Sequence, residues 1–172
     1  MSKLILERFK CREDTTESGA ESVYFMIYVA EARNGTAHSD VKFIRKEAWD
    51  NEVDKGDTFI TNITVSSGMH HDLVIVGMIE EDWDPDFENP VNLILAQNMK
   101  GLNGTLAAAT TMTTGVDDDL GHIVRDEFHS QLRNYIANDE IMGVKRWKSS
   151  SPTLTFSRDE GIYDVTLKLH AE

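Results

Sequence analysis

The chain has 172 residues, a net charge of −13 and an isoelectric point near 4.8. A surface this acidic repels the phosphates of nucleic acids and of anionic lipids, so it argues against nucleic acid as a partner and allows membrane contact only through a bound cation. A hydrophobic content of 40% supports a folded core, and the single Cys11 excludes an internal disulfide. We expect one domain over 1–172. It is predicted to be cytoplasmic, or exported without a cleaved signal peptide, because the first residues show no signal segment.

The first half of the chain predicts β-strands separated by polar loops. Strand-like patterns occupy 3–11, 23–30, 41–44, 58–65 and 72–79. Asn34-Gly35 predicts a tight turn, because both residue types accept a positive φ. The continuous apolar run 72–79 is typical of a central strand.

Beyond Pro90 the hydrophobic period changes to that of helices. Two short helices are predicted over 91–100 and 105–114, and a longer amphipathic one follows Asp117-Asp-Asp119 and ends near Asn138. Strands at 153–156 and 163–169 close the chain as a hairpin. The prediction is a mainly β fold (α+β by content), an antiparallel β-sandwich with a helical insertion before the last hairpin. The sandwich would comprise 1–89 and 149–172, and the insertion 90–148.

Two groups of acidic residues are candidate metal ligands. Asp82, Asp84 and Asp86 alternate directly after a predicted buried strand, and calcium prefers several carboxylate oxygens from such a loop. A helix-loop-helix calcium motif is excluded, because Phe87 stands where that loop needs glycine. The second group, Asp118 and Asp119, precedes Leu120-Gly121. A second interpretation stays open, in which these residues form solvated turns and a helix cap.

The order of these features resembles the calcium-loop side of a C-two domain, the β-sandwich module of many membrane-docking proteins. An apolar strand is followed by Asp82-Trp-Asp84 and later by Asp118-Asp-Leu-Gly121. The opening is also similar, since a strand ending at Cys11 leads to 19–24, where C-two domains carry a Gly-x-Ser-Asp-Pro-Tyr-like turn. The resemblance implies calcium as the one cofactor, held by Asp82, Asp84, Asp86, Asp118 and Asp119. Ser22 stands where a further aspartate ligand is expected, and Asp14 is the candidate to replace it.

The leading functional hypothesis is a non-enzymatic binding or self-assembly module whose partner is a protein or a second copy of the chain. The predicted contact residues are Trp83, Lys145, Arg146 and Trp147. The last three form a basic and aromatic cluster, although a helix C-terminus also carries such cations. One alternative is a pore-forming or toxin-like effector that uses 91–116, although the favoured interpretation of this segment is a lid helix over one end of the sandwich. Another is a small enzyme with an unrecognised site, for which no catalytic residue is predicted because the sequence lacks a nucleophile elbow and a phosphate loop.

Overall fold

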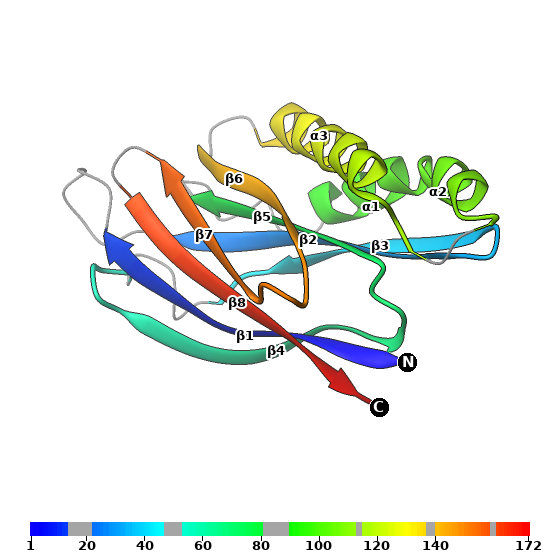
Figure 1. Cartoon of the computed structure of the whole chain (residues 1–172). Helices are drawn as coiled ribbons and strands as arrows, with labels where there is room; N and C mark the ends of the chain where they lie inside the picture. Colours follow the sequence, from blue (N-terminus) through cyan, green and yellow to red (C-terminus); the bar gives the residue numbers. More distant parts are fainter. Residues whose placement is uncertain (14–21, 47–52, 81–89, 113–114, 137–139, 159–160) are drawn as a thin grey trace.

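The computed structural model contains two four-stranded antiparallel β-sheets and three helices (Figure 1). It describes residues 1–13, 22–46, 53–80, 90–112, 115–136, 140–158 and 161–172. The first sheet has the strand order β4-β1-β8-β7, and the second has the order β3-β2-β5-β6. The strands are β1 (Ser2–Glu13), β2 (Val23–Arg33), β3 (Thr36–Ile44), β4 (Thr58–Met69), β5 (Leu73–Glu80), β6 (Glu140–Trp147), β7 (Thr153–Arg158) and β8 (Gly161–Ala171). The predicted antiparallel sandwich is confirmed.

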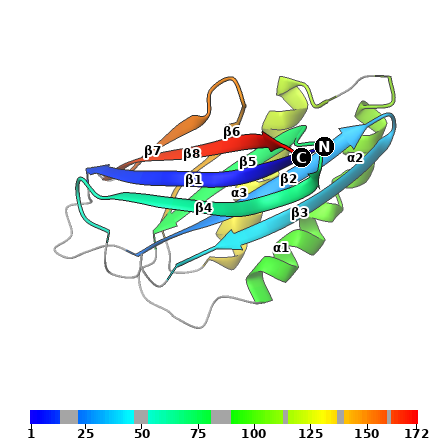
Figure 2. The same cartoon turned by 90° about the horizontal axis from the view of Figure 1, so that it is seen from below.

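The helices lie between β5 and β6 in the chain and cover the outer face of the second sheet (Figure 2). They are α1 (Pro90–Lys100), α2 (Asn103–Ala109) and α3 (Asp118–Tyr135). Leu95, Leu106 and Phe128 are fully buried against that sheet. The lid alternative is therefore wrong in its placement, because the helices cover a sheet face and not an open end. Among the helices that the structure describes, none is long and apolar enough to cross a membrane.

The two inner strands of the second sheet, β2 and β5, are buried on both faces. Along β2, Phe25 and Ile27 enter the core between the sheets, whereas Met26 and Tyr28 enter the core under the helices. β5 divides in the same way, and this explains its uninterrupted apolar sequence. Gly77 of β5 allows α3 to approach closely, because a Cβ there would lie 2.9 Å from Leu132 Cδ1.

The predicted helical insertion over 90–148 is wrong at its end, because 140–147 forms β6 and pairs antiparallel with β5. The side chains of β6 lack a clean alternation. Met142 and Trp147 enter the core between the sheets, whereas Ile141 enters the core under the helices. A register irregularity between Met78 and Ile79 of β5 accompanies this switch.

The strand ends define two ends of the sandwich. Val23, Glu80 and Glu140 are paired at one end of the second sheet. Arg158 Nε binds Glu140 Oε1 at 2.7 Å, so the same end of the first sheet lies beside them. At the opposite end Ser2 pairs with Ala171, which places the two termini together (Figure 1). The predicted turn at Asn34-Gly35 is confirmed by φ values of 50° and 78°.

Candidate functional site

Most of the predicted calcium ligands lie outside the described residues: Asp14, Asp82, Asp84 and Asp86, as does Trp83. Asp118 and Asp119 lie on the first turn of α3. Asp118 Oδ1 accepts hydrogen bonds from Lys148 Nζ at 2.8 Å and Arg146 Nη1 at 2.9 Å. The hydrogen bond from Lys148, followed by the charge of Lys148, lowers the pKa of Asp118. Within the described part of the chain, no group of three or more His, Cys, Asp or Glu side chains is arranged to hold a metal ion.

Asp118 lies far from Glu80, the last described residue before the first predicted acidic group. Glu80, two residues before Asp82, pairs with Glu140 at the start of β6, whereas Asp118 binds Lys148 directly after the last residue of β6. At about 3.3 Å per residue, the eight-residue β6 separates these points by roughly 23 Å. Asp118 therefore stabilises the start of α3 at the end of β6 that lies away from Glu80, whereas Asp82, Asp84 and Asp86 lie outside the described residues.

Arg146, predicted to bind a partner, instead attaches α3 to β6. Its side chain is 12% exposed. The guanidinium donates hydrogen bonds to the carbonyl oxygens of Val116 at 2.7 Å and Asp117 at 2.9 Å. A Cβ at Gly121 would lie 2.3 Å from Arg146 Nη1, so glycine leaves the space that the guanidinium occupies.

The other two residues of the predicted basic and aromatic cluster also make internal contacts. Trp147 is 4% exposed and donates from Nε1 to the carbonyl oxygen of Pro152 at 3.0 Å. Lys145 Nζ donates to the carbonyl oxygen of Thr155 and lies 5.6 Å from the centre of the Phe156 ring. The cluster therefore contributes mainly to joining β6 to β7 and α3, and Trp147 is not available to a partner.

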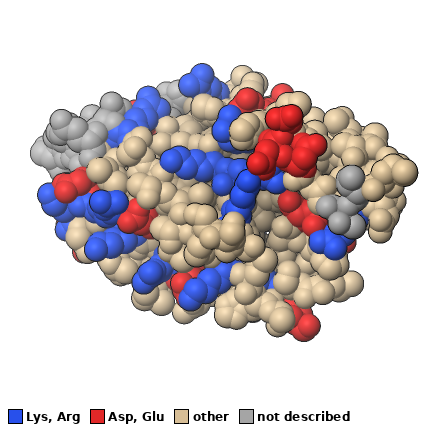
Figure 3. Space-filling view, in the orientation of Figure 1, with Lys and Arg blue, Asp and Glu red and all other residues tan. Residues whose placement is uncertain are grey.

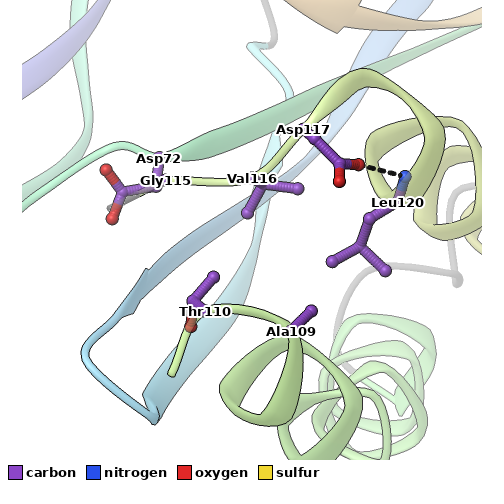
Figure 4. Close-up of a pocket in the computed structure, with 7 residues that line it drawn as sticks. All are labelled: Asp72, Ala109, Thr110, Gly115, Val116, Asp117 and Leu120. Carbon is purple, nitrogen blue, oxygen red and sulfur yellow. Dashed lines mark hydrogen bonds between the residues drawn. The ribbon is translucent and has the colours of Figure 1, made fainter. Parts of the chain in front are cut away.

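A cavity of about 380 Å³ lies between the start of β5 and the segment before α3 (Figure 4). Its two carboxylates are already engaged. Asp72 accepts from Arg33 Nη2 at 2.6 Å and from the Ala32 amide at 3.1 Å, and Asp117 Oδ1 accepts from the Leu120 amide at 2.8 Å. The acids of this cavity thus stabilise the fold and do not favour a ligand site.

His71 lies between two serine hydroxyls. Its Nε2 is 2.6 Å from Ser66 Oγ, and its Nδ1 is 2.9 Å from Ser2 Oγ. Burial outweighs the nearby charge of Asp72 and lowers the pKa of His71. Because Nδ1 faces a hydroxyl, the group differs from a catalytic triad, in which a carboxylate orients the imidazole. The contacts connect β1 to the end of β4 and give little support to the hypothesis of a small enzyme.

The outer face of the first sheet carries a concentration of basic side chains that sequence reasoning missed. Arg8, Lys10 and Arg12 are exposed and alternate with the buried Phe9 and Cys11 along β1. Together with Lys3 and Lys168 they make five basic side chains against two acidic ones, Glu7 and Asp164, so the local charge is about +3. We call this surface the basic face. Figure 3 looks onto this side of the molecule and shows basic side chains over β1, β8 and the neighbouring strands.

A groove of about 460 Å³ crosses the basic face from β7 to β4 and is lined by Arg8, Lys10, Thr58, Thr153, Asp164 and Thr166. The two acids of the basic face already have partners. Asp164 accepts from Thr155 Oγ1 at 2.7 Å and lies 3.7 Å from Arg12 Nη1, while Glu7 pairs with Lys168. Within the described residues, neither Arg8 nor Lys10 forms an ion pair. Thr153 Oγ1 and Thr166 Oγ1 lie 3.0 Å apart and share a hydrogen bond, so the groove presents to a ligand two cations, the exposed Thr58 and the remaining hydrogen-bonding capacity of that pair.

Acidic and basic residues are distributed unevenly along the chain. All 17 Lys and Arg residues lie among the described residues, which contain 16 Asp and Glu. The other 14 acids lie in 14–21, 47–52, 81–89, 137–139 and 159–160, which contain no Lys or Arg. In the chain, 14–21 follows Glu13, 81–89 follows Glu80, 137–139 precedes Glu140 and 159–160 follows Arg158, while 47–52 comes after β3, whose last residue pairs near the start of β2. These strand termini lie at one end of the sandwich. We call this the acidic end of the sandwich.

No protein-family model, curated protein or solved structure matches this chain. Any statement about function therefore depends on the surfaces described above. A signal for the basic face is present in the sequence, since Arg8 and Lys10 alternate with the apolar Phe9 and Cys11 in the predicted strand 3–11. The net charge of −13 conceals it, because the balancing acids lie in other segments.

Proposed function

We propose that this protein is a non-enzymatic binding module whose basic face binds an acidic segment of a protein partner. The observation that carries the proposal is the pair Arg8 and Lys10, which make no ion pair among the described residues and line a groove on an exposed sheet face. The helices cover the corresponding face of the second sheet, so this first sheet offers its outer surface to a partner.

The charges and hydroxyl groups of the groove determine how strongly a ligand should bind and which kind of partner fits. Each exposed ion pair contributes about 0.2–1 kcal/mol and is screened within about 8 Å at physiological salt. Two cations alone therefore give weak binding, and the threonine hydroxyls of the groove must add hydrogen bonds to the ligand. A protein segment fits better than a nucleic acid, because the acidic end would repel a long polyanion.

The proposal keeps the resemblance to C-two domains at the level of architecture, as a β-sandwich of two antiparallel sheets. Two antiparallel four-stranded sheets support a sandwich of that general kind. They do not by themselves distinguish it from other sandwiches.

The proposal is tested with a fluorescent ten-residue peptide that alternates glutamate with threonine. Fluorescence anisotropy should show saturable binding at about 20 mM salt and much weaker binding at about 300 mM. The double variant R8E/K10E should lose binding at least tenfold. The control K100E changes an exposed lysine on α1 and should bind like the unmodified protein. Equal binding by R8E/K10E and the unmodified protein would contradict the proposal.

Calcium binding at the acidic end is a second candidate function. The observation in its favour is that 14 acids and no base lie in the segments that adjoin this end. Asp14, Asp82, Asp84 and Asp86 are among those acids, whereas Asp118 and Asp119 are not. The candidate therefore concerns the first four residues alone, and a melting experiment with calcium and chelator tests it.

A further inference from the structure

We infer that the acidic segment of the partner is a phosphopeptide, whose phosphate lies at Arg8 while a carboxylate two residues away in the peptide faces Lys10. This inference rests on the proposed function and identifies the chemistry of the ligand. It begins from the two rows of paired residues that cross the groove from β4 to β7. The row through Arg8 and the row through Lys10 differ in charge, so they suit different anionic groups.

The row through Arg8 contains no acidic residue. Arg8 pairs with Ile60 of β4 on one side and with Thr166 of β8 on the other. Thr166 pairs in turn with Thr153 of β7. Within the described residues Arg8 forms no ion pair. An anion at this row therefore meets a positive charge that no described side chain neutralises.

The two threonines of this row keep one hydroxyl proton for a ligand. Thr153 Oγ1 and Thr166 Oγ1 lie 3.0 Å apart and share one hydrogen bond. Each hydroxyl has a single proton, so when Thr166 donates to Thr153, the exposed Thr153 can donate to a ligand. Thr153 lies two strands from Arg8, a distance of roughly 9–10 Å between Cα atoms. An anionic group above β8 can therefore contact the guanidinium and this hydroxyl together.

The row through Lys10 is close to neutral. Lys10 pairs with Asp164 of β8 on one side and with the exposed Thr58 of β4 on the other. Asp164 accepts a hydrogen bond from Thr155 Oγ1 at 2.7 Å and lies 3.7 Å from Arg12 Nη1. A phosphate dianion at this row would lie beside the Asp164 carboxylate, and like charges repel. A single carboxylate that faces Lys10 and Thr58 meets less repulsion.

A phosphate uses the groups around Arg8 more fully than a carboxylate does. The guanidinium can hold two oxygens of either group. A phosphoryl group has a third acceptor oxygen and a charge of about −1.5 to −2 at neutral pH. The third oxygen can accept from the Thr153 hydroxyl while the other two bind Arg8.

The spacing of the two cations determines the spacing of the anions in the peptide. The pairing of β1 with β8 is regular from Arg8 to Lys10, so their Cα atoms lie about 6.7 Å apart. An extended peptide repeats its side chains on one face at the same interval. A phosphorylated residue and an acid at alternate positions can therefore face Arg8 and Lys10 together.

Other phosphate-bearing ligands fit this groove less well. The described residues that line it include no aromatic side chain on which a base could stack, and this disfavours a nucleotide. A net charge of −13 repels long polyanions and anionic membranes more than a short peptide with a few charges.

Three fluorescent peptides test the inference by fluorescence anisotropy at about 20 mM salt. The first is the glutamate–threonine peptide. In the second a central glutamate is replaced by phosphoserine, and in the third the same glutamate is replaced by serine. The phosphoserine peptide should bind at least about threefold more tightly than the glutamate peptide, and the serine peptide should bind most weakly.

Four variants then locate the phosphate through the ratio of the affinities for the phosphoserine and glutamate peptides. R8K keeps the charge and loses the planar guanidinium, while T153V removes the hydroxyl and keeps the shape, so each should lower the ratio. K10A should weaken both peptides equally and leave the ratio unchanged. The control T105V changes an exposed threonine of α2 and should bind both peptides like the unmodified protein.

Three results would overturn the inference. One is equal affinity of the unmodified protein for the phosphoserine and glutamate peptides, and the second is a ratio that R8K or T153V leaves unchanged. The third is displacement of the phosphoserine peptide by about 1 mM inorganic phosphate but not by chloride at the same ionic strength, which would identify a free phosphate ion as the ligand. If the glutamate–threonine peptide still binds through Arg8 and Lys10 in these cases, the proposed function stands without a phosphopeptide as the partner. If that peptide also fails to bind, the proposed function is contradicted as well.

Discussion

Replacing Arg146 with alanine tests whether this residue holds the fold together or binds a partner. The variant R146A loses hydrogen bonds from a charged donor to the carbonyl oxygens of Val116 and Asp117, at 2.7 and 2.9 Å. It also loses the ion pair with Asp118, whose side chain is 68% exposed, so that pair contributes little. Hydrogen bonds to charged groups contribute about 1.5–3 kcal/mol each, and water replaces part of this near the surface. We expect the free energy of unfolding to fall by about 2–4 kcal/mol.

Urea denaturation followed by circular dichroism measures this change directly. For a chain of this size it corresponds to a decrease in melting temperature of roughly 4–16 °C. The control is R12A, which removes a side chain that is 52% exposed and makes one ion pair at 3.7 Å. R12A should change the free energy by less than about 0.5 kcal/mol. A loss below about 1 kcal/mol in R146A, or equal losses in the two variants, would refute the structural role of Arg146.

Three further predictions concern neighbouring features. G121A should destabilise the protein, because the new Cβ displaces Arg146. In the R146A background the same substitution should stabilise α3 by about 0.5–1 kcal/mol, because alanine has the higher helix propensity. Chemical denaturation of the unmodified protein, the two single variants and the double variant measures both changes in the free energy of unfolding. Because burial lowers the folded-state pKa of His71 below its usual 6.5, its contribution to stability is complete above pH 6.5 and decreases as the pH falls through the folded-state value. Melting temperatures between pH 7.5 and 5 should therefore fall less steeply for H71N, and identical slopes would contradict this. If calcium binds at the acidic end, about 1 mM calcium should raise the melting temperature relative to chelator, and D82N/D84N should remove the increase; no shift in the unmodified protein would exclude that site.

The main architecture could be predicted from the sequence because most strands carry a simple local pattern. The dense apolar segment 23–30 and the run 72–79 correspond to β2 and β5, the two inner strands of the second sheet. Both are buried on two faces, and this requires side chains that are apolar at every position. The helix after Asp117 was also predictable, since Asp117 caps it through the Leu120 amide.

β6 could not be predicted in this way. Its side chains divide between two cores, and a register irregularity in the pairing with β5 interrupts the alternation. It also contains Gly143, where a Cβ would lie 3.0 Å from Phe156 Cδ1, and glycine is unfavourable in a strand judged by propensity alone. The need for glycine comes from a residue of the following strand, which a local pattern does not show.

The contact between Asp118 and Arg146 was missed for a different reason. Asp118 and Arg146 are 28 positions apart, and sequence reasoning assigned the first to calcium and the second to a partner. In the fold they bind each other, a long-range contact that a local sequence pattern does not show. The basic face could have been recognised from Arg8, Lys10 and Arg12, because an alternating basic pattern in a strand places all three on one face.

The most direct test of the central claim is a map of amide chemical shifts as the glutamate–threonine peptide is titrated into the protein. If the basic face is the binding surface, the largest shifts should occur in β1 and β8, around Arg8, Lys10 and Thr166, and α1 to α3 should change little. The same titration of R8E/K10E should give no saturable shifts. Shifts concentrated on the helices or at the cavity near Asp72, or unchanged shifts in R8E/K10E, would contradict the account.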